Sequence, residues 1–160
     1  MADNNKLIYA REAYDGLCKS LDSIGWKYQR MDDELKIMFG VNGDDLPMTF
    51  LAIVDADRQL VRLISLLPFK MNKDKIVEGA VSVCAINYLL ADGSFDLDLE
   101  EGNILFKLTS CFRNSLLGEE TFKYMVSIAC HTIDLYNDKL FDLSEGRLSM
   151  GDLLDGVAGK

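Results

Sequence analysis

One apolar segment, from residue 74 to residue 92, limits the folds open to this sequence more than any other. Its apolar residues recur with helical spacing on two neighbouring sides. The first side carries Ile76, Ala80, Val83 and Leu90, and the second carries Val77, Val81, Cys84 and Tyr88. A helix that is apolar on two sides must be covered on both. We therefore expect one side to lie on a sheet and the other to meet a further helix or a second chain.

The segments around this helix have the alternation and the turn signals of antiparallel strands. Pro68 is expected to end the strand before it, because proline cannot donate to a ladder. The predicted elements are helix 5–24, strands 26–29, 35–41, 48–54 and 60–67, helix 74–92, strands 95–99 and 104–108, and helix 119–136. Strand 48–54 is apolar on both faces, which indicates a central position. The sequence thus predicts an α+β fold, with an antiparallel sheet of about four to six strands and three main helices in the order α-β-β-β-β-α-β-β-α.

The length fits one domain followed by a tail. A chain of 160 residues can bury roughly 70% of its unfolded surface, which is enough for a single core. We expect the domain over residues 1–137 and the tail over residues 138–160, where apolar residues alternate with glycines. The amphipathic pieces of this tail could dock on the domain or on a partner.

The charge balance excludes some partners. The chain has 17 Lys and Arg against 26 Asp and Glu, a net charge of −9, and no basic cluster. Nucleic acids and anionic membranes are poor partners for such a surface, because both need a positive patch. The first residues lack the pattern of a secretory signal, and no apolar run approaches the roughly 18 residues of a membrane span. We expect a cytoplasmic protein.

The four cysteines, Cys18, Cys84, Cys111 and Cys130, are widely spaced and include no Cys-x-x-Cys pair. Apolar neighbours favour buried, reduced thiols over a zinc site or a disulfide scaffold. A metal pair of Cys130 and His131 is the alternative, but adjacent helical residues point about 100° apart and rarely share a ligand. We expect neither a metal nor a cofactor.

Catalytic groups are scarce. His131 is the single histidine, and the sequence has neither a Gly-x-Ser-x-Gly elbow nor a glycine-rich phosphate loop. Ser127, His131 and Asp134 imitate a triad in composition. On one helix, however, they would form a surface stripe without an oxyanion hole. We expect no enzyme activity.

The alternating acids from Asp92 to Glu100 suggest a calcium loop, but Leu97 occupies the position that requires glycine. A strand with a charged face fits better, in which Asp96 or Asp98 meets Lys107 across a hairpin.

The aromatic residues Trp26, Tyr28 and Phe39 at alternating strand positions could form a ligand box, although such residues belong to a core more often.

Several short motifs, in a fixed order, resemble one known family. They are Gly25-Trp26-Lys27-Tyr28, Pro68-Phe69, Asn87-Tyr88-Leu89-Leu90, Gly93-Ser94-Phe95-Asp96 and Gly102-Asn103-Ile104-Leu105-Phe106. Over the stretch from Leu7 to Tyr136, they resemble the YbjN domain family. Its members are bacterial proteins described as sensory transduction regulators, and their fold is similar to that of class I type III secretion chaperones.

The resemblance implies a homodimer that binds protein segments without chemistry. Secretion chaperones dimerise largely through the second helix and a nearby strand, which agrees with the two apolar sides found independently in residues 74–92. We therefore expect the dimer interface at Val77, Val81, Cys84 and Tyr88. The resemblance also implies that Asn87 and the Gly93-Ser94-Phe95 turn are structural.

Two functional hypotheses follow. The first is a non-enzymatic protein-binding domain, chaperone-like or a regulatory adaptor, that acts as a homodimer and holds an extended segment of a partner protein along grooves and strand edges. The alternative is a small-molecule sensor or a minor enzyme with a pocket between sheet and helices, lined by Trp26, Asn87 and His131.

Overall fold

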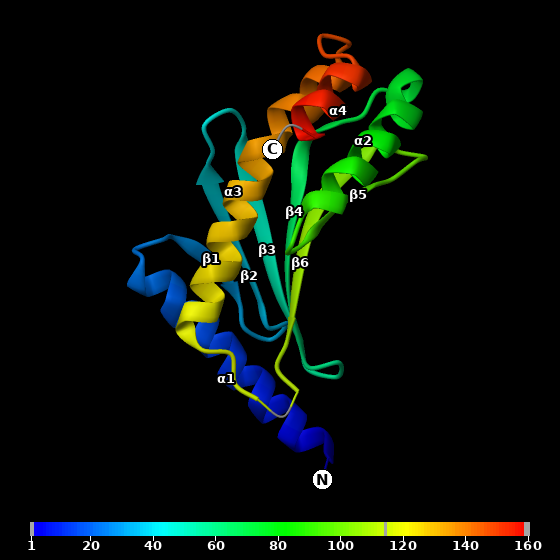
Figure 1. The fold of residues 1–160 in the computed structure, drawn as a ribbon. Helices are drawn as coiled ribbons and strands as arrows, with labels where there is room; N and C mark the ends of the chain where they lie inside the picture. Colours follow the sequence, from blue (N-terminus) through cyan, green and yellow to red (C-terminus); the bar gives the residue numbers. More distant parts are fainter. Residues whose placement is uncertain (1, 114, 159–160) are drawn as a thin grey trace.

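The computed structural model describes residues 2–113 and 115–158, which form four α-helices, one short 3₁₀ helix and six strands (Figure 1). In chain order these are α1 (Ala2–Ser23), β1 (Tyr28–Met31), β2 (Lys36–Asn42), β3 (Pro47–Asp55), β4 (Leu60–Lys70), η1 (Lys73–Lys75), α2 (Ile76–Leu89), β5 (Ser94–Leu97), β6 (Asn103–Cys111), α3 (Glu119–Ser144) and α4 (Met150–Ala158).

The strands form a single sheet in the order β1-β2-β3-β4-β6-β5, and every neighbouring pair is antiparallel. The predicted α+β class and the predicted element order are confirmed through α3. β3 lies in the interior of the sheet, between β2 and β4, as its apolar sequence indicated.

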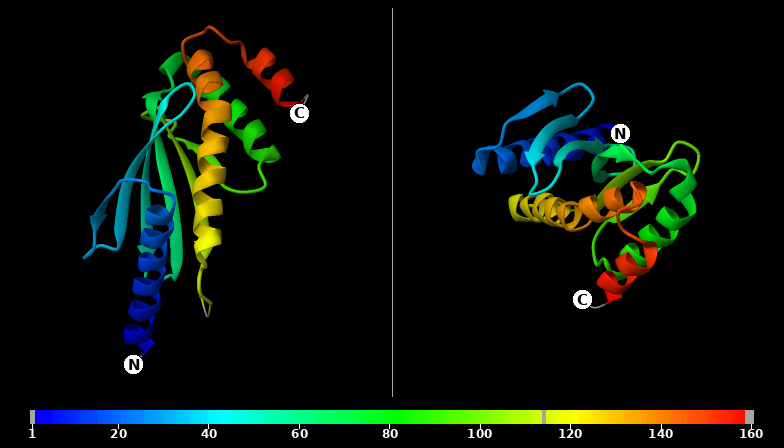
Figure 2. Two further views of the ribbon diagram at one scale, coloured as in Figure 1. Left: turned by 90° about the vertical axis from the view of Figure 1, so that its left-hand side faces the viewer. Right: turned by 90° about the horizontal axis from the view of Figure 1, so that it is seen from above.

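The core lies between the sheet and the helices. α1 and α3 lie over one face of the sheet, while α2 lies beside β5 and carries α4 (Figures 1 and 2). Alternate residues of the strands are buried on this side, as the pleat requires. The largest fully buried side chains include Tyr14, Phe50, Phe95, Phe106, Phe112 and Phe122.

Pro68 does not end β4, contrary to the prediction. The strand continues to Lys70, which pairs with Asn103, and the register shifts between Leu66 and Lys70. A bulge of this kind accommodates a residue that cannot donate to the ladder. The strand therefore bends around the proline and does not stop there.

Two helix ends also differ from the prediction. α2 ends at Leu89, because Leu90 has an extended backbone. α3 continues past Tyr136 to Ser144, because the buried residues Leu140 and Leu143 extend its apolar stripe. α3 therefore crosses residue 137, and the division of the chain into domain and tail at this position stays a prediction.

The predicted tail contains α4, which packs on α2 and buries Leu153 and Val157. The sequence left open whether the amphipathic pieces of the tail dock on the domain or on a partner. α4 docks on its own domain. Within the part of the chain that the structure describes, no helix has both the length and the apolar character that a membrane span requires.

Candidate protein-binding surfaces

The most exposed apolar surface of an α-helix lies on α2. The side chains of Val77, Val81 and Tyr88 are 77%, 44% and 88% exposed, and Cys84 between them is also exposed. The opposite side buries Gly79, Ser82, Val83 and Ile86 against β5, α3 and α4. One apolar side of α2 is thus covered within the chain. The other side, which we call the α2 face (Val77, Val81, Cys84 and Tyr88), faces outward.

A side-chain amide fixes the α2 face relative to the sheet. Nδ2 of Asn87 donates to the carbonyl oxygen of Phe95 at 2.8 Å, and Oδ1 of Asn87 accepts from the amide of Phe95 at 2.8 Å. Between them, Gly93 has a φ of +76°, and a Cβ at this position would lie 2.3 Å from Cζ of Phe106. The end of α2 is therefore held on β5 by a tight turn that requires glycine. These contacts agree with the structural roles that the resemblance implied.

Both edges of the sheet are short strands. β1 and β5 have four residues each, and they pair only with residues 36–39 of β2 and residues 104–107 of β6. The longer strands β2 and β6 therefore extend beyond their edge partners. An extended peptide can pair with exposed edges of this kind by strand addition.

A further surface, which the sequence did not single out, is the side of the sheet that faces away from the helices. We call it the open face. Its apolar side chains are Met38, Leu51, Ile53, Ile64, Leu66 and Leu105, all at least partly exposed. Within residues 2–113 and 115–158, no helix covers this face (Figure 2). One sequence pattern could have indicated the open face: strand 48–54 is apolar on both faces and not only on the side that meets the helices.

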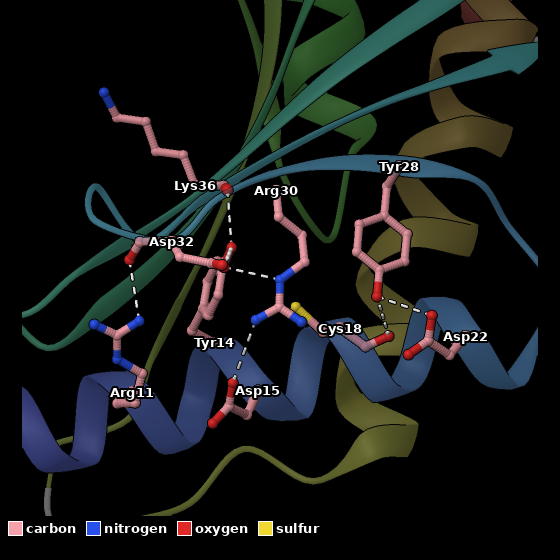
Figure 3. A network of polar contacts seen from close by, with 9 residues as sticks. All are labelled: Arg11, Tyr14, Asp15, Cys18, Asp22, Tyr28, Arg30, Asp32 and Lys36. Carbon is pink, nitrogen blue, oxygen red and sulfur yellow. Dashed lines mark hydrogen bonds and ion pairs between the residues drawn. The ribbon is translucent and has the colours of Figure 1, made fainter.

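A polar network joins α1 to the β1–β2 hairpin (Figure 3). The Tyr14 hydroxyl donates to Oδ1 of Asp32 at 2.7 Å, and Nε of Arg30 donates to the same oxygen at 2.8 Å. The Arg30 guanidinium also lies over the Tyr14 ring, 5.3 Å from its centroid. Arg11 donates to the backbone oxygen of Asp32 at 3.0 Å. The network therefore fixes the angle between the first helix and the sheet edge.

This environment shifts the ionisation of its members. Burial and the hydrogen bond to Asp32 raise the pKa of Tyr14 to about 12. The hydrogen bonds from Tyr14 and Arg30 lower the pKa of Asp32 below its ordinary value. Burial, together with the bond to Asp22, raises the pKa of Tyr28 above its ordinary value. Each shift favours the neutral phenol and the charged carboxylate, which are the forms that the network needs.

The residues of the alternative small-molecule pocket do not come together. Asn87 is engaged with Phe95. Trp26 lines a hollow of about 330 Å³ beside Val41 and α3, whereas His131 lines a separate one of about 400 Å³ between α3 and the end of α2. Trp26 also packs on Phe39, with ring centroids 5.7 Å apart, so the predicted aromatic residues form part of the core.

The cysteine prediction is wrong for two of the four residues. All four thiols are free, but only Cys18 is buried and Cys130 is partly buried, while Cys84 and Cys111 are exposed. Burial raises the pKa of the Cys18 thiol above its ordinary value and that of Cys130 to about 11. Cys84 is exposed because its helical neighbours belong to the uncovered α2 face, where apolar character does not imply burial.

The acidic segment after α2 is a hairpin with a charged face, as the pairing argument predicted. Asp96 forms an ion pair with Lys107 across β5 and β6. Oδ1 of Asp98 accepts from the amides of Glu100 and Glu101 in the turn, which lowers the pKa of Asp98.

The three residues that imitate a catalytic triad in composition lie on α3. Ser127 and His131 are exposed, and the Asp134 carboxylate accepts from the backbone amide of Asp44 at 2.8 Å.

An antiparallel sheet with helices on one side and short edge strands is an architecture that this chain shares with two solved structures. YbjN from E. coli, described as a proposed transcription regulator, has this fold: the TM-score is 0.62 at 12% identity, over 82% of this chain and 92% of that one. A chain of the HopA1–SchA chaperone–effector complex has it as well, with a TM-score of 0.54 at 17% identity, over 84% of this chain and 96% of that one. The predicted YbjN-like and secretion chaperone-like fold is therefore confirmed. No protein-family model matches the sequence, and no curated protein matches it.

Proposed function

We propose that this protein is a non-enzymatic, homodimeric protein-binding domain, a chaperone-like or regulatory adaptor that holds an extended segment of a partner protein. The observation that carries the proposal is the α2 face: a stripe at helical spacing whose two terminal residues, Val77 and Tyr88, are 77% and 88% exposed. Large apolar side chains gathered on one helix face are typical of an interface.

The arrangement supports a two-fold dimer. A two-fold interface uses the same patch on both copies, so a single apolar stripe is sufficient. A partner segment can use the β1 edge, because strand addition needs backbone groups and no reactive side chain. In β5, by contrast, Asn87 binds both backbone groups of Phe95. Both similar structures are described as regulatory or chaperone proteins, which supports a binding role.

The test is the oligomeric state of Val81→Asp. Val81 lies in the middle of the α2 face, and burying an unpaired carboxylate from each copy in an apolar dimer interface is strongly unfavourable. We expect the wild type to elute as a dimer and Val81→Asp as a folded monomer, measured by light scattering and circular dichroism at micromolar concentration.

Leu116→Asp is the matched control. Leu116 is 66% exposed and belongs to the connection between β6 and α3. This connection lies at the opposite end of the molecule from α2 (Figure 1). It should leave the dimer intact. A wild-type monomer at these concentrations, or a dimer that survives Val81→Asp, would contradict the assignment of the interface to α2.

A further inference from the structure

The apolar residues of the open face are aligned across the strands. Met38 pairs with Leu51, and Leu51 pairs with Ile64, so three apolar side chains form a row over β2, β3 and β4. Beside this row, Leu66 pairs with Leu105. Leu66 is 55% exposed. The helices bury the other side of the sheet, and a sheet that is apolar on both sides usually carries a layer on each.

Cations border this apolar row. The next position after Ile64 is Lys107, and the adjacent row runs from Lys36 through Ile53 to Arg62. On the strands, the outward positions carry the cations Lys36, Arg62, Lys70 and Lys107 and the carboxylates Asp55 and Asp96. The chain as a whole has 17 cations against 26 acids. Glu34 and Glu101, just beyond the strands, pair with Lys36 and Lys70, so the open face is less acidic than the molecule as a whole.

Arg62 has hydrogen-bonding capacity to spare. Within the described residues, its nearest carboxylate is that of Asp55, with Nη2 3.8 Å from Oδ2, while its buried Nε has no hydrogen-bond partner. The other cations of the face form exposed ion pairs, such as Lys36 with Glu34, which are worth little and exchange easily with a competing carboxylate. The Nη end of Arg62 is partly exposed and lies beyond hydrogen-bond distance of Asp55. An arginine of this kind next to apolar residues is well suited to bind a carboxylate as well as an apolar side chain.

The spacing of the row fits a helix. Neighbouring strands lie about 4.8 Å apart, and an α-helix rises about 5.4 Å per turn. A helix that crosses β2, β3 and β4 can therefore place one apolar residue per turn over Met38, Leu51 and Ile64 in succession. Acidic residues on the borders of its apolar side would then reach Arg62 and Lys107.

We propose that the open face binds an amphipathic helix of a partner protein, in which acidic residues border the apolar side. This inference rests on the proposed protein-binding function and adds a helical segment of the partner to the extended segment named there. It is independent of the α2 face, which lies on a helix at the other side of the β5 edge and which we assign to the second copy.

The test uses synthetic peptides and the full-length chain. The first peptide is helix-forming, with leucines at helical spacing flanked by glutamates. In the second peptide every glutamate is replaced by lysine, and in the third a central proline interrupts the first sequence. Fluorescence anisotropy should show binding of the glutamate peptide, and binding at least about tenfold weaker for the lysine and proline peptides.

Variants then locate the site. Leu66→Asp should weaken binding of the glutamate peptide about tenfold, while Leu116→Asp should not. Arg62→Glu should reverse the preference, so that the lysine peptide binds more tightly than the glutamate peptide. This gain of binding could not come from a misfolded variant. Val81→Asp should change the oligomeric state and leave peptide affinity unchanged.

Three results would overturn the proposal: no binding of the glutamate peptide, equal binding of the glutamate and lysine peptides, or a glutamate-peptide affinity that Leu66→Asp leaves unchanged. A loss of peptide binding in Val81→Asp alone would place the site on the α2 face and also overturn it. If the wild type is monomeric by light scattering but the charge reversal by Arg62→Glu holds, the dimer proposal fails and the partner site stands.

Discussion

Asn87 uses both polar atoms of its amide on the backbone of one residue, Phe95. Replacement by alanine leaves the amide and the carbonyl of Phe95 without these partners. We expect Asn87→Ala to lower the free energy of unfolding by about 1–3 kcal/mol, measured by urea denaturation. Asn103→Ala is a control, because Asn103 lies at the start of β6 with a partly exposed side chain. Equal stability of Asn87→Ala and the wild type would show that the amide does not hold the end of α2 on β5.

Tyr14 gives the protein a specific alkaline response. Its pKa is raised to about 12 by burial and by the hydrogen bond to Asp32. A raised pKa means that the folded state favours the neutral phenol, so this contribution to stability is complete below the ordinary pKa of tyrosine and is lost as the pH rises through about 12. Asp32 has the opposite sign: its pKa is lowered, and its contribution is lost as the pH falls below its ordinary pKa.

Phenolate absorbance during an alkaline titration tests this assignment. Tyr14→Phe should reduce the absorbance change at the high-pH end of the curve, which we call the late phase, by the contribution of one tyrosine. Tyr9→Phe, a change on the exposed side of α1, should leave the late phase in place. A late phase of full amplitude in Tyr14→Phe would contradict it.

At the scale of elements, most of the fold could be predicted from periodicity and turn residues. Gly25 ends α1 with a φ of +72°, and the alternation in β3 placed it inside the sheet. The bulge at Pro68 could not be predicted, because it depends on the pairing of Lys70 with Asn103, far away in the sequence. Periodicity marked Val77 and Tyr88 as apolar without showing that they are exposed. The apolar open face stayed hidden because an outward apolar residue and a buried one look alike in a strand sequence.

α4 contributes few residues to the core. It has nine residues, two of them glycines, and it buries Leu153 and Val157 mainly against α2. We expect Leu153→Ala to release α4 while the sheet stays folded, because a short helix depends on its packing for stability. Hydrogen–deuterium exchange should become faster in residues 150–158 and stay slow in β3 and β4. Gly156→Ala, where nothing lies near the added methyl group, should not speed exchange. Cooperative loss of protection in β3 and β4 would show instead that α4 belongs to the main folding unit.

At the scale of the whole molecule, the α2 face predicts how two copies meet. A two-fold axis through the middle of the stripe pairs the helices antiparallel, so that Val77 of one copy faces Tyr88 of the other and Val81 faces Cys84. Cys84 is a free, exposed thiol. A cysteine at position 81 would therefore lie opposite the native thiol of the second copy, at a distance that a disulfide can bridge.

Val81→Cys should consequently form a covalent dimer under mild oxidation, visible on a non-reducing gel and reversed by a thiol reductant. Adding Cys84→Ser to the same chain should reduce the cross-link strongly, because position 81 then faces a hydroxyl. Leu116→Cys, equally exposed but distant from α2, should give no comparable product at the same protein concentration. If Val81→Cys cross-links as efficiently without Cys84 as with it, the helices pair in parallel register, with each residue facing its own copy, and the antiparallel arrangement is wrong. The cross-link thus reports the geometry of the dimer, which light scattering on Val81→Asp cannot distinguish.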